Sequence, residues 1–148
     1  MPESIDTQVR VALFREFVQS GRAPSAGRIA ELMGMPEEEI RSALERLASG
    51  KAIVLQPYSR ELLMANPLYA VPTPYLVRVG NRSFFGACIW DALGIIAMLK
   101  TDGLVETSCP CCGEAMSIPV LDNRPAPVNG VIHFALPAKR WWENIVFT

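Results

Sequence analysis

The sequence predicts an α+β fold in which a three-helix module precedes a small mixed β-sheet domain with one buried helix. Apolar residues recur at helical spacing through residues 1–50, and short strand-like runs separated by Gly, Pro and Asn follow them. One longer and almost wholly apolar segment, residues 83–100, interrupts these runs and has the length of a helix. Helices followed by strands are typical of an α+β chain, here with expected domains 1–65 and 66–148.

Composition excludes several classes of protein. Of the 148 residues, 50% are hydrophobic and 20% charged, as in a globular chain. Lys and Arg number 14 against 15 Asp and Glu, so the positive charge of a duplex-binding protein is missing. No apolar run is long enough to cross a bilayer, and the N-terminus has no signal-peptide pattern. We therefore expect a cytoplasmic protein whose four cysteines are thiols or metal ligands.

The first half predicts three helices followed by a pair of strands. A short helix, a Met-Gly-Met turn and a longer helix form a helix-turn-helix pattern. The β-rich run at residues 52–65 follows where a winged version of that motif has its two-stranded wing. The expected helices are residues 5–19, residues 26–33 with Ser25 as N-cap, and a third between Pro36 and Gly50.

Charge argues against DNA binding by this motif. The third helix would be the recognition helix, and its first residues are Glu37, Glu38 and Glu39. These positions approach bases and phosphates in DNA-binding proteins, where carboxylates are repelled. We expect a structural module rather than a nucleic-acid-binding one, with a winged-helix regulator that responds to metal as the alternative.

The second half predicts strands around one helix. Residues 66–74 hold three prolines and indicate a linker or an irregular crossing. Residues 75–79 and 82–85 predict a hairpin, because Gly80-Asn81 suits a tight turn. His133 is expected to be a hydrogen-bonded core residue of the last strand. The further expected elements are strands at residues 104–107, 116–121 and 131–136, and a short amphipathic helix from residue 137 that runs into a strand start before Thr148.

Cys88 and Asp91 lie three residues apart at the start of the apolar segment. On a helix, residues i and i+3 share a face, so the thiol and the carboxylate would point into the same small, dry volume. A carboxyl group there has a raised pKa and can hold or pass on a proton, and the thiol is a candidate nucleophile or soft-metal ligand. Alternatively, Cys88 is an ordinary buried residue and Asp91 is favoured in the first turn by the helix dipole.

A cysteine-rich turn, C-P-C-C-G, follows at residues 109–113. Cys109 and Cys112 have the C-x-x-C spacing of a zinc knuckle, whose tight turn directs two sulfurs at one ion. Three interpretations stay open: a bound structural zinc, a redox pair, or a turn whose cysteines only pack. A tetrahedral zinc needs two more ligands, for which the soft candidates are Cys88, Cys111 and His133.

These segments, in this order, resemble the organomercurial (alkylmercury) lyases. The likeness is carried by the helix-turn-helix module, the hairpin and the motifs A-C-I-W-D-A-L-G-I, S-C-P-C-C-G, V-I-H-F-A-L and R-W-W-E-N-I-V-F-T. It covers most of the chain and is specific in the C-terminal half. The resemblance implies a winged-helix-like structural module at residues 1–65 and an alkylmercury-lyase-like domain at residues 66–148.

The resemblance implies protonolytic cleavage of a carbon–mercury bond by two cysteines and an aspartate. Cys88 matches the first catalytic cysteine, a mercury ligand, and Asp91 matches the catalytic aspartate beside the mercury. Cys109 matches a further cysteine that takes no part in the chemistry. The implied partners are a small organometallic substrate and low-molecular-weight thiols that remove Hg²⁺. No cofactor is required, because mercury is the metal of substrate and product, and zinc stays a possibility for Cys109 and Cys112.

The family's second catalytic cysteine lies just beyond the segment that matches W-W-E-N-I-V-F-T, and this sequence ends at Thr148. We expect either a chain truncated at this end or a protein without that thiol. In the second case Cys111 or Cys112 is a candidate substitute, although their positions do not match. Lyase activity is expected if a second thiol is available, and the alternative is a non-catalytic relative that binds metal through its thiols.

Overall fold

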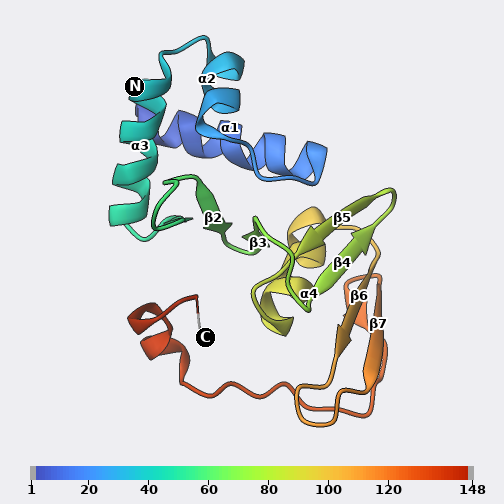
Figure 1. Ribbon diagram of the computed structural model, residues 1–148. Coiled ribbons are helices and arrows are strands. Elements are labelled where there is room, and N and C mark those ends of the chain that lie inside the picture. The colour runs from blue at the N-terminus through green and yellow to red at the C-terminus, as the bar shows by residue number, and fades with distance from the viewer. Residues whose placement is uncertain (1–2, 147–148) are drawn as a thin grey trace. The chain divides into compact units, whose positions relative to one another are not determined.

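Helices precede an antiparallel sheet along the chain, as the sequence predicts for an α+β protein (Figure 1). The computed structural model describes residues 3–146. The chain forms two units, Met1–Val71 and Pro72–Thr148. Within the described residues, no helix is long and apolar enough to span a membrane.

The first unit contains the three predicted helices, α1 (Ile5–Ser20), α2 (Ala26–Met33) and α3 (Glu37–Ser49). The expected caps are confirmed: Ser25 accepts a hydrogen bond from the Arg28 backbone N–H, and Gly34 ends α2 in the left-handed region. Apolar side chains at helical spacing are buried between the helices. They are Val9, Leu13, Phe17, Ala26, Ile29, Ala30, Ile40, Ala43 and Leu44.

Three short antiparallel strands complete this unit: β1 (Val54–Leu55), β2 (Leu62–Ala65) and β3 (Leu68–Tyr69). The prediction of a plain linker at residues 66–74 is wrong, because β3 lies inside it and pairs with β2. Leu68 and Tyr69 are both buried, so apolar packing outweighs the neighbouring prolines there.

The sheet of the second unit has the strand order β5, β4, β6, β7, β8. All its pairings are antiparallel, so the expectation of a mixed sheet is wrong. Tight turns join β4 to β5, β6 to β7 and β7 to β8, and such turns join only antiparallel neighbours. The strands are β4 (Leu76–Val79), β5 (Arg82–Phe85), β6 (Gly103–Ser108), β7 (Ala115–Leu121) and β8 (Arg124–Pro125).

Helix α4 (Ile89–Leu99) connects β5 to β6 and packs on β4 and β6 (Figure 1). Its buried residues, Ala92, Ile95 and Ile96, form one face, whereas Trp90 is 58% exposed. The helix expected within residues 83–100 is confirmed over Ile89–Leu99 and is buried on one side only, whereas residues 83–85 belong to β5. At Gly103, a Cβ would lie 2.9 Å from the Ile96 side chain, so a glycine lets the helix approach the sheet closely.

The chain after β8 runs without regular structure to the 3-10 helix η1 (Ala138–Glu143). The predicted strand at residues 131–136 is wrong: Val131 is 92% and Ile132 47% exposed, and this segment pairs with no strand in the described part of the chain. Past Pro125, which has no N–H to donate, the Ala126 N–H still donates to the Pro119 carbonyl at 2.7 Å, and a second proline, Pro127, follows it. The expected strand start before Thr148 reaches positions 147–148, which lie outside the described residues.

Candidate active site

Cys88 occupies the N-cap position of α4, with an extended backbone at φ −149° and ψ 179°. The approach to this position is held by Gly86, whose N–H donates to the Tyr75 carbonyl at 3.1 Å and whose carbonyl accepts from Thr73 Oγ1 at 2.6 Å. A Cβ on Gly86 would lie 2.6 Å from the Ala92 backbone nitrogen. The strand end and the first turn of α4 are therefore in such close contact that only glycine fits, and this contact sets where Cys88 points.

The structure brings Cys88 and Asp91 together, as their spacing predicts. Both side chains are half-buried. Burial raises the pKa of the Cys88 thiol; the backbone N–H groups of Asp91 and Trp90 oppose this rise, and the Asp91 carboxylate adds to it. Burial also raises the pKa of the Asp91 carboxyl, against the lowering by the Ala87 backbone and by the Cys88 thiol. The pair therefore favours protonated forms.

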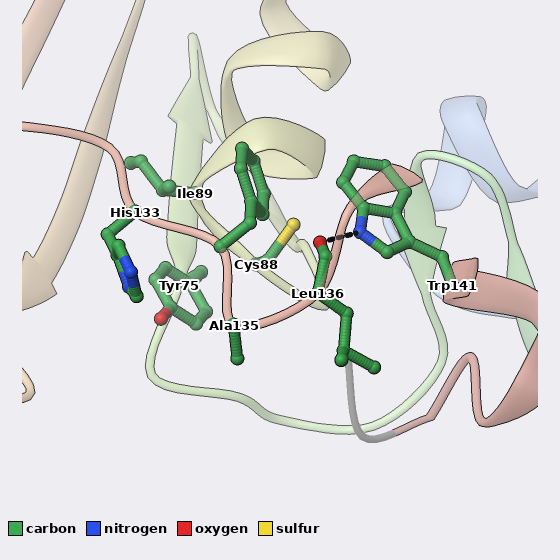
Figure 2. A pocket seen from close by; sticks show the side chains of 8 residues that line it. Tyr75, Cys88, Ile89, His133, Ala135, Leu136 and Trp141 are labelled. Carbon is green, nitrogen blue, oxygen red and sulfur yellow. Dashed lines mark hydrogen bonds between the residues drawn. The ribbon is translucent and has the colours of Figure 1, made fainter. Parts of the chain in front are cut away.

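A hollow of about 140 Å³ opens beside Cys88. Figure 2 shows the Cys88 sulfur between side chains that come from three segments: the residues before β4, the start of α4, and the chain leading into η1. Aromatic rings pack along it, since the Phe134 centroid lies 5.0 Å from that of Trp141 and 6.4 Å from that of Trp90. The residues that line the hollow include Tyr75, Cys88, His133, Phe134, Leu136 and Trp141.

The C-terminal segment supplies most of this lining, which the sequence did not predict. The Trp141 indole N–H donates to the Leu136 carbonyl at 2.9 Å and so fixes a loop over the hollow (Figure 2). The expectation that His133 is a core residue is wrong, because it is exposed at the hollow and not paired within a strand. Its apolar neighbours had suggested burial in a sheet, whereas here they face the hollow and solvent.

The second cysteine cluster lies at the turn between β6 and β7. Cys109 is half-buried, whereas Cys111 and Cys112 are exposed. The backbone N–H groups of Cys112 and Cys111, together with the Cys112 thiol, hold the pKa of the Cys109 thiol below its usual range. In the described part of the chain, no three His, Cys, Asp or Glu side chains are grouped so that they could hold a metal ion. Among these residues, the turn is therefore not grouped with Cys88 or His133 as the ligands of one ion.

Comparison with known proteins agrees with this architecture. The alkylmercury lyase (MerB) family model matches residues 68–148, more than half of the chain, so the chain belongs to the alkylmercury lyase family. No curated protein matches it.

Among solved structures, the chain is similar to the mercury-bound form of MerB2. The TM-score is 0.65 at 21% sequence identity, over 87% of this chain and 61% of that one. At this identity the similarity concerns the fold. The chain spans about 61% of the length of that structure.

Proposed function

We propose that this chain has an organomercurial-lyase-like function, cleaving carbon–mercury bonds by protonolysis at Cys88 and Asp91. The observation that carries the proposal is the pairing of a half-buried thiol with a half-buried carboxyl group beside an apolar hollow, in a member of the alkylmercury lyase family. Mercury is a soft metal that prefers thiolates, and a carboxyl group with a raised pKa is a suitable proton donor near neutral pH.

The first step is capture of the substrate cation R–Hg⁺ by Cys88. A sulfur–mercury bond forms and the thiol proton leaves, either to the Asp91 carboxylate when that group is ionised or to solvent when Asp91 is already protonated. The mercury then replaces the proton on sulfur, so a thiol that is protonated at rest is no obstacle to binding. Asp91 keeps the proton close to the bond that will break.

The second step is transfer of that proton to carbon. A second thiolate bound to mercury raises the electron density on the metal and weakens the mercury–carbon bond. The bonding pair of that bond takes the proton from Asp91, which releases R–H and leaves Hg²⁺ on two thiolates. A small thiol can serve as the second ligand and, in exchange, remove the product. The reaction as written requires no resident cofactor.

The hollow supports a small organic group on the substrate. Its volume of about 140 Å³ is close to the roughly 150 Å³ of a protein cavity that accepts benzene. Phe134, Leu136 and Trp141 offer apolar contacts to such a group. Phenyl and short alkyl groups should fit there, whereas a much larger aryl group should not.

For the N-terminal unit we propose a structural role as a winged-helix-like module. The first-turn glutamate Glu37 pairs with Arg41, and Arg41 also pairs with Glu61 at 2.9 Å. Arg46 pairs with Asp6 at 2.7 Å. The cations of α3 are thus engaged with carboxylates of the same unit, which supports a structural helix surface over one that contacts phosphates.

The test is hydrocarbon release from a phenylmercury salt in the presence of excess small thiol. Benzene is measured by gas chromatography for the wild-type chain, Cys88→Ser and Asp91→Asn, with Cys111→Ser as a control because Cys111 is exposed and outside the hollow. We expect benzene release by the wild type and by Cys111→Ser, and loss of benzene release in the other two variants. Stoichiometric mercury binding without benzene release would instead identify a non-catalytic, metal-binding relative.

A further inference from the structure

The turn between β6 and β7 holds three cysteine side chains that the proposed reaction does not use, Cys109, Cys111 and Cys112. We propose that Cys109 and Cys112 form a second, separate site that binds one Hg²⁺ ion as a two-coordinate dithiolate. Binding at this turn does not depend on Cys88. That the ion arrives as a reaction product does rest on the proposed lyase function.

The backbone of the turn holds both cysteines in place before any ion arrives. The Cys109 N–H donates to the Glu114 carbonyl at 2.8 Å, and the Gly113 N–H donates back to the Cys109 carbonyl at 2.8 Å. Gly113 has φ +75°, a conformation that favours glycine and lets the chain reverse at once into β7. The turn therefore continues the β6–β7 ladder, in which Ser108 pairs with Ala115 next to the turn.

The two sulfurs are neighbours within this turn. The Cys112 thiol and its backbone N–H both interact with the Cys109 sulfur, as does the backbone N–H of Cys111. N–H groups that face a sulfur are the usual surroundings of metal-binding sulfur ligands. The third cysteine, Cys111, contributes its backbone to this arrangement and leaves its own thiol exposed to solvent.

Ligand number selects the kind of ion. A structural zinc takes four ligands, and the described residues offer no group of three or more His, Cys, Asp or Glu side chains around an ion. Mercury(II) is soft and is satisfied by two thiolates in a near-linear arrangement. The binding step is balanced: Hg²⁺ forms two sulfur–mercury bonds, and the two thiols release two protons.

The test uses the full chain with Cys88 replaced by serine, so that the pocket thiol cannot contribute. The chain is incubated with one equivalent of HgCl₂ and a small monothiol, passed through a desalting column, and its mercury is measured by mass spectrometry. If Cys109 and Cys112 bind the ion together, we expect one ion per chain. Replacing either cysteine by serine should weaken retention of the ion against the monothiol by about 10²-fold or more, because the chelate advantage is lost.

The matched control is Cys111→Ser in the same background, which removes a thiol from the same turn. Retention should be unchanged in this variant. Equal loss in all three variants, or retention in Cys109→Ser and Cys112→Ser, would overturn the assignment. Circular dichroism verifies that each variant is folded. Because hydrocarbon release is measured separately with Cys88 intact, failure of the dithiol site and failure of the lyase function give different results.

Discussion

Cys88 and Cys109 carry the same side chain in opposite surroundings within one unit of the protein. At Cys88, burial beside a carboxyl group raises the pKa of the thiol, whereas at Cys109 the backbone N–H groups of Cys112 and Cys111 lower the pKa of the thiol. The first arrangement keeps a proton next to the bound metal, which proton transfer to carbon requires. The second arrangement favours the thiolate form, which is the form of cysteine that binds Hg²⁺. Burial and the direction of the backbone N–H groups, rather than the cysteine side chain itself, therefore distinguish the proposed reactive thiol at Cys88 from the proposed ion-binding thiol at Cys109.

The largest effect that separates the two sites is expected from Asp91→Asn. The variant keeps the shape of the side chain and removes the proton that we assign to the leaving carbon, so benzene release should fall by about 10²- to 10⁴-fold. Mercury retention at the turn, measured as in the test above, should differ by less than about twofold between this variant and the chain that keeps Asp91, because distant sites act independently. Benzene release at the wild-type rate would show that Asp91 is not the proton donor.

A backbone change should affect the pocket next most strongly. In Gly86→Ala the new Cβ meets the Ala92 nitrogen at 2.6 Å, so the first turn of α4 must shift and Cys88 with it. A displacement of about 1 Å lowers rates by roughly 10²-fold. The control is Gly130→Ala, whose Cβ meets only the flexible end of Met116 at 3.4 Å. Single-turnover rates of both variants give the result, and equal rates would contradict this role for Gly86.

Thiol reactivity should differ between the two sites, because the pKa of Cys88 is raised and that of Cys109 is lowered. Because each pKa unit changes the thiolate fraction tenfold, iodoacetamide should label Cys109 at lower pH than Cys88. Labelling rates at each cysteine, followed by peptide mass spectrometry from pH 6 to pH 9, measure this directly. In urea the two rates should converge, since both causes depend on folding. Identical pH profiles in the folded chain would contradict a difference in pKa between Cys88 and Cys109.

The smallest effect concerns stability. The pKa of Asp91 is raised in the folded chain, so its favourable contribution is full below the ordinary carboxyl pKa and is lost as the pH rises through the folded value. Asp91→Asn should therefore gain thermal stability relative to the wild type as the pH rises above about 4, the ordinary carboxyl pKa. Melting temperatures across this range measure it, with the exposed Asp122→Asn as control. A difference that does not change with pH would contradict a buried carboxyl group.

Local patterns in the sequence predicted the elements that hold Cys88. The apolar segment predicted α4, and the Gly80-Asn81 dipeptide predicted the β4–β5 hairpin. The i, i+3 spacing predicted that Asp91 lies near the Cys88 thiol. These features depend on neighbours along the chain, and local chemistry is sufficient to determine them.

The walls of the hollow could not be predicted in this way. Its lining comes from separate segments of the chain and includes Tyr75, Phe134 and Trp141. The spacing of residues within one segment cannot predict a contact between distant segments. The apolar run at residues 131–136 indicated a strand, but a strand requires a free edge to pair with, and composition does not reveal one. His133 was assigned to the core for the same reason, and it lies exposed at the hollow.

The most direct test of protonolysis at Cys88 is a single turnover of phenylmercury in D₂O with the protein in excess over substrate and a small thiol present. We expect the wild-type chain and Cys111→Ser to release benzene that carries one deuterium, and Cys88→Ser to release none. Absence of benzene from the wild type, or equal release by Cys88→Ser, would contradict it.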